Sequence, residues 1–450
     1  MKNRSDIIAA QATPAGEGGI AIVRVSGKGC DALCGVIFRA KNGRPLEPRR
    51  LTFGHVIAQG EVIDEAMAVF LPAPHTYTRE DVLEIHCHGS QALVSRILYL
   101  LMHSGVRMAE PGEFTYRAFV NGRIDLAQAE GVMRMIRAGS LRAMNSAVRQ
   151  MEGGVSSFVR KAREEIISLL AAISASIDFP DEVEEEQTAQ QVREGCEAIA
   201  RRLRGASNMH AGVVEEEGLG VVFAGRPNAG KSSLLNALVG GDRAIVTDIP
   251  GTTRDTLTEI VQYDGVRLRL TDTAGLRKTQ DAVERIGVER ALRALRDADV
   301  RVLVADMSDP EGLEGDGLHG YDPDIVVMNK SDLPSVLTQE DVRARYANAH
   351  LVQVSAQQGW GVEALCALLT RYAQTPGEES EVLTQVRHVS KAMDACLALD
   401  EAAKAIEAGY PLDTAAVDLS AALDALGEIT GETMNEKVID EVFARFCVGK

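Results

Sequence analysis

The sequence predicts a multidomain chain with mixed α/β and all-α parts, in which a doubly wound α/β domain is inserted within a helical domain. Three observations predict this fold class. Short β-type runs separated by Gly and Pro occupy residues 1–120. Apolar residues at helical spacing dominate residues 121–214 and again residues 379–450. Between them, in residues 215–378, strand-like runs alternate with helical segments, which is typical of a parallel sheet with helices on both faces.

The N-terminal part, residues 1–120, is predicted to be an α+β domain. Residues 19–25, 66–71 and 81–86 are rich in β-branched and other apolar residues, so we expect them to form strands. Residues 91–103 carry apolar side chains at helical spacing, which predicts a helix.

The helical domain is predicted in two parts. In the first part, Val155, Val159, Ile166 and Ile173 form one apolar stripe at helical spacing. This helix is expected to end near Pro180, since a proline disfavours helical backbone in the residue before it. The second part follows the inserted domain and has a similar stripe. We therefore expect the two parts to pack together as one domain.

The inserted domain contains a phosphate-binding loop. Residues 225–232 read Gly-Arg-Pro-Asn-Ala-Gly-Lys-Ser and fit the pattern GxxxxGK[ST] between a predicted strand, residues 219–224, and a predicted helix. Glycines let such a loop wrap so that its N–H groups and the positive end of the helix meet the β- and γ-phosphates. Lys231 adds a positive charge, and the hydroxyl of Ser232 is an oxygen ligand for Mg²⁺.

Two further motifs identify the nucleotide. Asp-Thr-Ala-Gly at 272–275 follows a predicted strand, so the aspartate can steady hydrated Mg²⁺ and the glycine N–H can contact the γ-phosphate. Asn-Lys-Ser-Asp at 329–332 follows another strand. Its terminal carboxylate can accept two hydrogen bonds from guanine, whereas adenine has no such donor pair. Backbone N–H groups in residues 354–356 can bind guanine O6. Together these motifs predict GTP as the ligand.

The residue after the second motif is Leu276, where Ras-like proteins have a glutamine that positions the attacking water. Leucine cannot position water, so hydrolysis requires another device. A cation at the β–γ bridge is one chemically reasonable way to neutralise the developing charge. Asn228, in the phosphate-binding loop, is a candidate oxygen donor for such a cation.

Composition limits the other function classes. The chain has 450 residues, enough for roughly three domains. It carries 48 Lys and Arg against 65 Asp and Glu, a formal charge of −17, and only 4% aromatic residues. A protein whose main task is to coat nucleic acid usually has a basic balance or stacking aromatic residues. Any contact of this chain with nucleic acid must therefore use a local patch.

The cysteines and the apolar runs predict a cytoplasmic protein with reduced thiols. The seven cysteines are widely scattered and contain no Cys-x-x-Cys pair, so they do not form a disulfide framework. Charges and glycines interrupt the apolar residues near the start, so no signal-peptide core follows Met1. No run approaches the 18 or more apolar residues that a membrane span requires.

Short motifs occur from near residue 6 to the end of the chain. Four of them are Gly-Thr-Thr-Arg-Asp at 251–255, Asp-Thr-Ala-Gly-Leu-Arg at 272–277, Asn-Lys-Ser-Asp at 329–332 and Phe-Cys-Val-Gly-Lys at 446–450. Five N-terminal motifs accompany them, at residues 10–14, 24–27, 79–84, 111–114 and 125–130. Together they resemble the MnmE (TrmE) family of tRNA-modification GTPases. The first motif is shared with other bacterial GTPases, whereas the terminal Cys-x-Gly-Lys is specific to this family.

The resemblance implies a function for each domain of the chain. It implies a folate-binding N-terminal domain that also dimerises (1–120), a helical domain in two parts (121–214 and 379–450), and a Ras-like P-loop GTPase domain (215–378). With the flavin-dependent protein MnmG, the family adds an aminomethyl-type (carboxymethylaminomethyl) group to C5 of wobble uridine 34 of certain tRNAs. A tetrahydrofolate derivative (5-formyl- or methylene-tetrahydrofolate) supplies the one-carbon unit, and K⁺ stimulates the GTPase. The implied partners are a second copy in a homodimer, MnmG in a heterotetramer, and tRNA.

The resemblance also assigns site residues at matching positions. The catalytic residue that orients the water would be Glu284. The Mg²⁺ ligands would be Ser232 and Thr253, and the K⁺ ligands would be Asn228, Thr247, Ile249 and Thr252. The folate contacts would be Arg24, Glu84, Arg123 and Lys450, where Arg123 stands at a position that is lysine in some relatives. The GTP contacts would be Asn228, Ala229, Gly230, Lys231, Ser232, Ser233, Thr247, Asp248, Ile249, Pro250, Gly251, Thr252, Thr253, Asp272, Thr273, Ala274, Gly275, Asn329, Lys330, Ser331, Asp332, Ser355 and Ala356.

Two alternatives stay open. Cys447 is either a small hydrophobic residue near a helix end or, because the neighbouring Gly449 and cationic Lys450 favour a mobile thiolate, a catalytic residue that handles the one-carbon unit. The second function class is an RNA-binding ribosome-assembly GTPase, which shares the nucleotide motifs. That class has no use for a folate-type N-terminal domain or for the terminal Cys-x-Gly-Lys.

Overall fold

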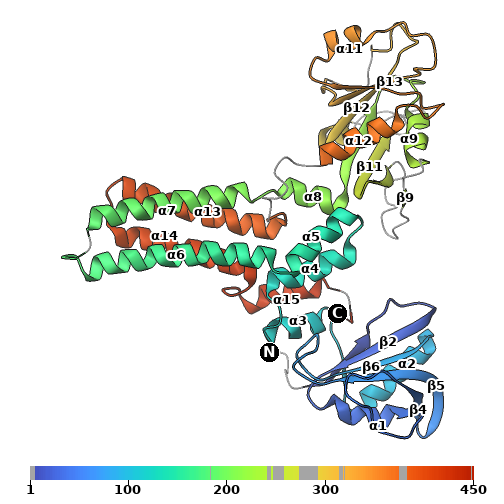
Figure 1. The fold of residues 1–450 in the computed structure, drawn as a ribbon, viewed down its shortest axis with the longest axis vertical. Helices are drawn as coiled ribbons and strands as arrows, with labels where there is room; N and C mark the ends of the chain where they lie inside the picture. Colours follow the sequence, from blue (N-terminus) through green and yellow to red (C-terminus); the bar gives the residue numbers. More distant parts are fainter. Residues whose placement is uncertain are drawn as a thin grey trace, which may run out of the picture. The chain divides into compact units, whose positions relative to one another are not determined.

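In a computed structural model of the protein, the structure describes residues 6–182, 184–240, 245–246, 258–272, 292–313, 318, 320–373, 383–446 and 448–449. The chain forms two compact units, each assembled from separate stretches of sequence (Figure 1). The first unit comprises Met1–Met133, Gln150–Ala171 and Leu419–Lys450, and the second comprises Arg134–Arg149 and Ala172–Asp418.

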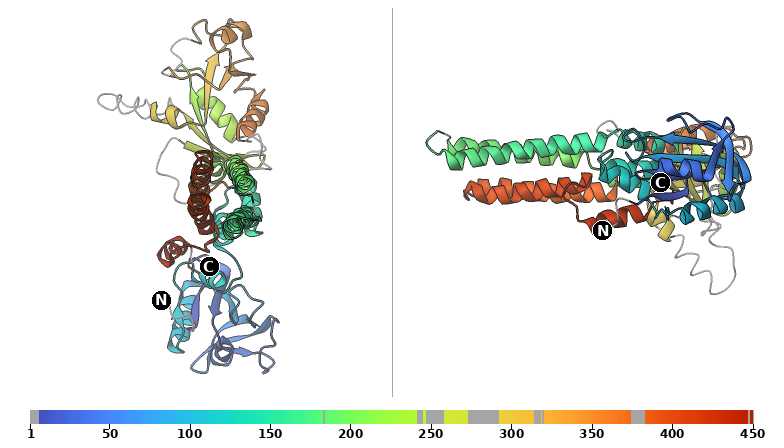
Figure 2. Two further views of the ribbon diagram at one scale, coloured as in Figure 1. Left: turned by 90° about the vertical axis from the view of Figure 1, so that its left-hand side faces the viewer. Right: turned by 90° about the horizontal axis from the view of Figure 1, so that it is seen from below.

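The first unit contains a seven-stranded sheet, drawn in blue and teal in Figures 1 and 2, in the order β3-β4-β5-β6-β2-β1-β7. Its strands are β1 (Ile8–Gln11), β2 (Gly18–Ser26), β3 (Phe38–Ala40), β4 (Thr52–Ala58), β5 (Glu61–Leu71), β6 (Val82–Gly89) and β7 (Arg107–Met108). All neighbours are antiparallel except β1 and β7. The three strands and the helix predicted in this region are confirmed, the helix as α2 (Gln91–His103).

The sheet has one buried face and one more open face, because side chains alternate along each strand. On the buried face, Val23, Ile85 and the α2 residue Ile97 are fully buried and form part of the core. On the other face, Arg24 of β2 lies opposite Glu84 of β6. An antiparallel sheet with one apolar face thus presents polar side chains from distant parts of the sequence on its other face.

Helices at both ends of the first unit pack against each other. They include α3 (Glu113–Val120), α4 (Leu126–Arg137) and α15 (Glu436–Ala444). Leu126 and Met133 of α4 share a core with Phe443 of α15 and with Phe446. The C-terminal residues are therefore anchored to the N-terminal third of the chain.

The second unit contains a long helix pair. In it, α7 (Glu185–Gly205) packs against α13 (Val386–Glu407), as the two-part helical domain predicts (Figure 1). Two more long helices, α6 (Gly154–Asp178) and α14 (Leu412–Thr430), contribute residues to both units. The predicted end of α6 near Pro180 is confirmed.

Two segments of backbone, around residues 207 and 383, connect the helix pair to the inserted domain and are hydrogen-bonded to each other. We call this pair of segments the neck. The N–H of Asn208 donates to the carbonyl of Leu383 at 2.9 Å, and the N–H of Leu383 donates to the carbonyl of Ala206 at 2.9 Å. Residues 207 and 383, which are far apart in the sequence, form a parallel bridge. The chain therefore enters and leaves the inserted domain at adjacent points.

The inserted domain has a seven-stranded sheet in the order β14-β13-β12-β8-β11-β10-β9. Its strands are β8 (Leu219–Ala224), β9 (Ile245–Val246), β10 (Thr258–Tyr263), β11 (Val266–Asp272), β12 (Val300–Asp306), β13 (Ile325–Asn329) and β14 (His350–Gln353). The strand-like runs of the inserted domain, at residues 219–224, 267–271, 300–305, 325–328 and 351–354, are confirmed as β8, β11, β12, β13 and β14. These five strands are parallel to their neighbours among them, while β10 is antiparallel to β11.

Both faces of this sheet are covered, which confirms the doubly wound fold class. One core contains residues of α9 (Lys231–Val239) and α12 (Val362–Ala373). The other contains Leu295 and Val342, the latter on α11 (Gln339–Arg345). Within the described residues, no helix is long and apolar enough to cross a membrane.

Candidate functional site

The predicted phosphate-binding loop lies at the carboxyl end of β8, and α9 begins at Lys231. Lys231 is only 4% exposed, and its ammonium group donates to the carbonyls of Gly225 and Arg226, at 2.7 Å each. The side chain therefore folds back over the loop. A lysine in this place puts its charge where phosphate oxygens would meet the loop and the positive end of α9.

Asn329 joins this loop to a second loop of the domain. It is 2% exposed, and its Nδ2 donates to the carbonyl of Ala229 at 2.8 Å, while its Oδ1 accepts from the N–H of Ala356 at 3.1 Å. Gly230 has φ 94°, and a Cβ atom there would lie 2.2 Å from Asn329 Nδ2. Glycine is required at this position for both reasons. The residues predicted to bind phosphate and those predicted to bind the base thus share one buried side chain.

Ser232 and Asp272 meet at the start of α9. The hydroxyl of Ser232 donates to Oδ2 of the Asp272 carboxylate at 3.0 Å, although the two residues are 40 positions apart. A hydroxyl and a carboxylate are the hard oxygen donors that Mg²⁺ prefers. The donor set therefore fits the predicted magnesium site.

The predicted guanine-binding residues converge in one loop pair. Oδ1 of Asp332 accepts from the hydroxyl of Ser355 at 2.6 Å, and Ser355 is fully buried while Asp332 is exposed. The buried hydroxyl of Ser355 thus orients the Asp332 carboxylate. The N–H of Ser355 donates to the carbonyl of Trp360 at 2.9 Å. The N–H of Ala356 donates to Asn329, so both N–H groups already have an acceptor within the protein. A guanine base that accepted from either one would share that N–H group with the present acceptor.

Lys330 has a partner that no motif predicts. Its ammonium lies 2.5 Å from Oδ2 of Asp306, at the end of β12. Partial burial raises the pKa of Asp306, but hydrogen bonds from Lys330 and Ser308 outweigh this and hold that pKa below its ordinary value. The pair fixes the start of the guanine-binding loop to the neighbouring strand.

A second group of predicted residues lies on the sheet of the first unit. Nε of Arg24 donates to Oε1 of Glu84 at 2.8 Å, and both side chains are about four-fifths buried. The guanidinium of Arg24 lies 5.9 Å from the centre of the Phe114 ring. The guanidinium of Arg123 lies 4.6 Å from the centre of the Tyr77 ring, and its Nη1 donates to the Tyr77 carbonyl at 3.2 Å. Three of the four predicted folate contacts are thus described.

One small cluster connects these three residues. Phe114 is fully buried and Tyr77 packs against the same core. The hydroxyls of Tyr77 and Thr115 lie 3.0 Å apart. Phe114 and Thr115 are both on α3, so this helix supports the aromatic rings beneath both arginines. The sequence motif at 111–114 contained Phe114, but nothing in the sequence indicated Tyr77.

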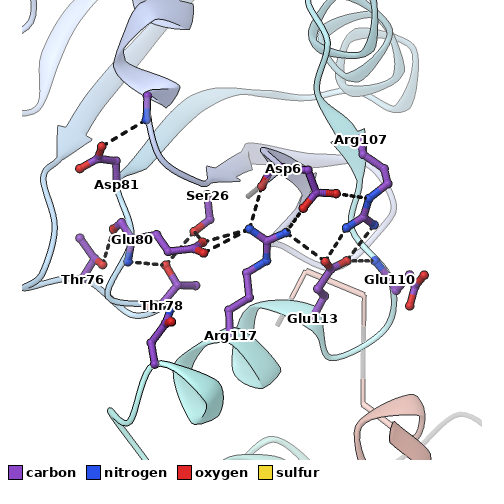
Figure 3. A network of polar contacts seen from close by, with 12 residues as sticks. Asp6, Ser26, Thr76, Thr78, Glu80, Asp81, Arg107, Glu110, Glu113 and Arg117 are labelled. Atoms are coloured by element: carbon purple, nitrogen blue, oxygen red, sulfur yellow. Dashed lines mark hydrogen bonds and ion pairs between the residues drawn. The ribbon is translucent and has the colours of Figure 1, made fainter. Parts of the chain in front are cut away.

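A buried ionic network holds α3 in place (Figure 3). Arg117 of α3, with a side chain 7% exposed, bonds to Asp6 at 2.7 Å, Glu80 at 3.1 Å and Glu113 at 3.2 Å. Arg107 bonds to Asp6 at 2.7 Å and to Glu113 at 2.6 Å. These contacts connect α3 to the N-terminus, to β7 and to the turn before β6.

Burial and pairing act in opposite directions on the carboxyls of the network. Burial raises the pKa of Asp6 and of Glu113, but the hydrogen bonds from Arg107 and Arg117 outweigh it and lower both pKa values below their ordinary range. Both groups are therefore carboxylates at neutral pH, and their pairing stabilises the fold.

The C-terminal residues approach the same region. Gly449 has φ 92°, and a Cβ atom there would lie 2.1 Å from the carbonyl oxygen of Gln11. Gln11 ends β1, in which its neighbour Ala10 lies opposite Arg24 of β2. Backbone of the terminal motif and a predicted folate contact are thus close together.

The remaining predicted site residues lie outside the described part of the chain. They are Thr247, Asp248, Ile249, Pro250, Gly251, Thr252, Thr253, Thr273, Ala274, Gly275, Glu284, Cys447 and Lys450. Three other predicted contacts are exposed: Asn228 and Ser331 in the two loops of the nucleotide site, and Ser233 in the first turn of α9. Among the described residues, no group of three or more His, Cys, Asp or Glu side chains is placed to hold a metal ion.

Comparisons with protein families and with individual proteins agree with this arrangement. A family model described as the MnmE helical domain matches residues 126–447, and one described as the GTP-binding protein TrmE N-terminus matches residues 7–123. Three similar proteins are each named tRNA modification GTPase MnmE. The first, from Geobacillus kaustophilus, is 45% identical over 99% of both chains. The second, from Bacillus velezensis, is 44% identical over 99% of this chain and 100% of that protein. The third, from Listeria innocua, is 43% identical over 99% of both chains.

Proposed function

The chain belongs to the MnmE family of tRNA modification GTPases, and on that premise we propose that it installs a carboxymethylaminomethyl-type group at C5 of wobble uridine 34 of certain tRNAs. It binds and hydrolyses GTP, as the family does. The one-carbon unit comes from a tetrahydrofolate derivative bound by the N-terminal domain. A flavin-dependent MnmG protein takes part in the same reaction.

One observation supports the proposed modification chemistry. The backbone of Gly449, two residues beyond Cys447, packs on Gln11, next to the strand pair that holds Arg24 and Glu84. Gly449, which lies between Cys447 and Lys450 in the sequence, is thereby held beside β1, the strand that pairs with the one carrying Arg24. A GTPase without one-carbon chemistry would have no need for this arrangement.

The nucleotide site supports hydrolysis through charge stabilisation. Lys231 exchanges its two loop carbonyls for oxygens of the β- and γ-phosphates, to which it brings its charge. Ser232 and Thr253 would hold Mg²⁺, and Asp272, which accepts from Ser232, would steady it. The ion neutralises charge on the β- and γ-phosphates when bound. Asp332, oriented by Ser355, selects guanine.

Two devices replace the glutamine that the chain lacks after its Asp-Thr-Ala-Gly motif. Glu284 orients the attacking water. Oxygen atoms of Asn228, Thr247, Ile249 and Thr252 would hold K⁺, which would supply positive charge to the transition state. Asn228 supports this assignment, since it is exposed in the phosphate-binding loop with φ 65°.

The folate site uses paired charges. A pterin ring offers N–H donors that a carboxylate such as Glu84 accepts, and its glutamate tail carries carboxylates that guanidinium groups bind. Arg24, Arg123 and Lys450 supply the cations. Cys447 contributes a thiol beside this site, where it handles the one-carbon unit. We further propose that the chain works as a homodimer, in a heterotetramer with MnmG, in the cytoplasm where its tRNA substrate is found.

Mass analysis of wobble uridine tests the proposal. Cells that lack this gene should lose the C5-modified uridine, and expression of the wild-type chain should restore it. Cys447→Ser should restore it poorly while leaving GTP turnover intact. Normal C5-modified uridine in the deletion strain would sink the proposal.

The cation requirement has its own test. GTP turnover by the purified chain should be faster in KCl than in NaCl at the same ionic strength. Equal rates in the two salts would remove the K⁺ site from the proposal and leave the remainder standing.

A further inference from the structure

A strongly basic segment interrupts the acidic chain at the edge of the first unit's sheet. Between residues 39 and 50 it carries five cationic side chains and one carboxylate, although the whole chain has a formal charge of −17. The cations are Arg39, Lys41, Arg44, Arg49 and Arg50. All five are exposed. The segment runs from β3 into β4, and we call it the β3–β4 loop.

A second basic segment shows that such a run does not by itself make a surface. Residues 134–149 contain four arginines and no acidic residue. Arg134, with a side chain only 9% exposed, binds Glu215 at 2.7 Å. Arg142, 18% exposed, donates to the carbonyl of Ala373 at 2.5 Å. The charges of Arg134 and Arg142 are used in packing on the GTPase domain, and of the arginines in this segment only Arg137 and Arg149 are exposed. In the β3–β4 loop, by contrast, all five cations face solvent.

The β3–β4 loop has a defined shape. Arg49 has φ 63° and donates through Nη2 to the carbonyls of Pro72 and His75, at 3.1 and 3.0 Å. Arg50 pairs with Glu47 at 2.8 Å, an exposed contact of the kind that contributes little and can be exchanged for another anion. The loop is therefore held by the backbone beside it while its other cations remain available.

A hollow in this loop combines charge with an aromatic ring. Its volume is about 400 Å³, and Lys41, Asn42, Arg50 and Phe53 are among the residues that line it. The Phe53 side chain is exposed, and the Lys41 ammonium lies 5.2 Å from its ring centre. A cation beside an exposed ring is the combination that single-stranded nucleic acid needs, since phosphate binds the cation and a base stacks on the ring.

The hollow opens on the same face of the sheet as the predicted folate contacts. Phe53 lies opposite Met67, and Met67 lies opposite His86, so all three share one face. Glu84 is two residues from His86 and faces the same way. Two strand spacings, about 10 Å, separate β4 from β6. A nucleic acid bound at the loop would therefore reach toward the Arg24–Glu84 pair.

We propose that the β3–β4 loop binds tRNA, with Lys41, Arg44 and Arg50 on its phosphates and Phe53 stacked on an unpaired base. The proposal rests on the proposed function, because tRNA is the polyanion on which this family acts. It places the local patch that an acidic chain needs for contact with nucleic acid.

Binding of a fluorescently labelled, unmodified tRNA transcript to the full-length chain tests the proposal by anisotropy over a range of KCl concentrations. The triple variant Lys41→Gln/Arg44→Gln/Arg50→Gln should bind about tenfold more weakly or worse at 0.1 M salt, and its slope of log affinity against log salt should fall by about two to three. Phe53→Ala should weaken binding about fivefold or more with little change of slope. GTP turnover should be unchanged in both.

The matched control removes the same charge elsewhere. Arg160→Gln/Lys161→Gln/Arg201→Gln lies on exposed helix positions and should bind tRNA as the wild type does. The charge-conserving Lys41→Arg/Arg44→Lys/Arg50→Lys should retain the salt slope. Equal losses in the control, or wild-type affinity and slope in the first triple variant, would overturn the proposal. The latter result is also expected if the loop meets an acidic protein surface instead.

The same variants separate this proposal from the proposed function. Failure of the wild-type chain to restore C5-modified uridine in the deletion strain would count against the proposed function, whatever the loop does. A wild-type chain that restores the modification, together with a triple variant that binds tRNA normally, would overturn only the assignment of the loop.

Discussion

The two seven-stranded sheets of this chain build their sites in different ways. The mostly parallel sheet of the GTPase domain gathers loops at the carboxyl ends of β8, β11 and β13, so each functional side chain stays within its own sequence motif. The antiparallel sheet of the first unit displays side chains on a face, where Arg24 and Glu84 meet across strands although 60 residues separate them. A site made of loops at the ends of strands, which we call a loop-built site, can thus be predicted from local sequence. A site made of side chains on one sheet face, which we call a face-built site, depends on strand register.

The largest expected effect tests whether the two regions are stabilised separately. Arg117→Met removes the buried cation that Asp6, Glu80 and Glu113 share, so the first unit should lose about 3–5 kcal/mol of unfolding free energy. Trp360, the only tryptophan, lies in the GTPase domain. In urea, the transition seen by circular dichroism should move to lower concentration, while the Trp360 fluorescence transition stays in place.

This experiment can also show that the first unit and the GTPase domain do not unfold separately. Arg160→Met, at an exposed helix position, should change stability by less than about 0.5 kcal/mol and serves as the control. If Arg117→Met moved the Trp360 transition by the same amount, the two regions would unfold as one cooperative unit.

The next effect concerns the loop-built site. Asp332→Asn removes the carboxylate that Ser355 orients, so affinity for GTP should fall on the order of 100-fold while affinity for xanthosine triphosphate rises. Calorimetric titration measures both. Asp322→Asn, an exposed carboxylate in the same domain, should leave both affinities unchanged. Unaltered GTP affinity in Asp332→Asn would refute the role of this residue.

A smaller effect is expected at the end of the chain. Gly449→Ala puts a Cβ atom 2.1 Å from the Gln11 carbonyl in a left-handed backbone, so the terminal motif should leave its place. C5-modified uridine should fall about tenfold or more in complemented cells, because a displaced segment cannot position its groups, while GTP turnover stays unchanged. Gly409→Ala has a similar φ of 77° and open space around it, and is the control. Equal modification in the two variants would separate the terminal motif from the chemistry.

The smallest effect is a pH dependence confined to the first unit. Asp6 and Glu113 have pKa values below those of the unfolded chain, so the unfolded state binds more protons and stability falls as the pH drops below the unfolded values. Between about pH 5 and pH 3 the first unit should lose its stability more steeply in the wild type than in Asp6→Asn. Thermal melts at each pH measure this. The exposed Asp31→Asn should follow the wild type, and a curve for Asp6→Asn as steep as the wild type would contradict the role of the network.

The nucleotide motifs and most of the fold could be predicted from the sequence. A strand, a glycine-rich loop and a helix follow one another locally, so residues 225–232 were readable without knowledge of the fold. The pairing of Lys330 with Asp306 was not readable, because it depends on β12 lying beside β13. Strands β3 and β4 were also missed, since Gly54 and the basic loop interrupt their short apolar patterns.

The face-built site shows why pairing escapes sequence analysis. The motif at 111–114 indicates that Glu113 matters, but which cation neutralises a buried carboxylate depends on tertiary packing. Here Glu113 is neutralised by Arg117 of the same helix and by Arg107 of β7. Arg117 in turn binds Asp6, which lies 111 residues earlier in the sequence. The need for a local basic patch could be inferred from composition, whereas its location depends on which basic side chains are exposed in the fold. Arg134 and Arg142 of the second basic segment, for example, are held in packing contacts.

The hydrogen-bonded neck at Ala206, Asn208 and Leu383 bears on how the inserted domain could be added or removed. A domain whose two ends are adjacent can be added to, or removed from, a helical hairpin without disturbing the hairpin's own connections. The GTPase module is attached in this manner, as a cassette between α7 and α13. A gene in which a short linker joins the two sides of the neck should therefore still encode the paired helices α7 and α13.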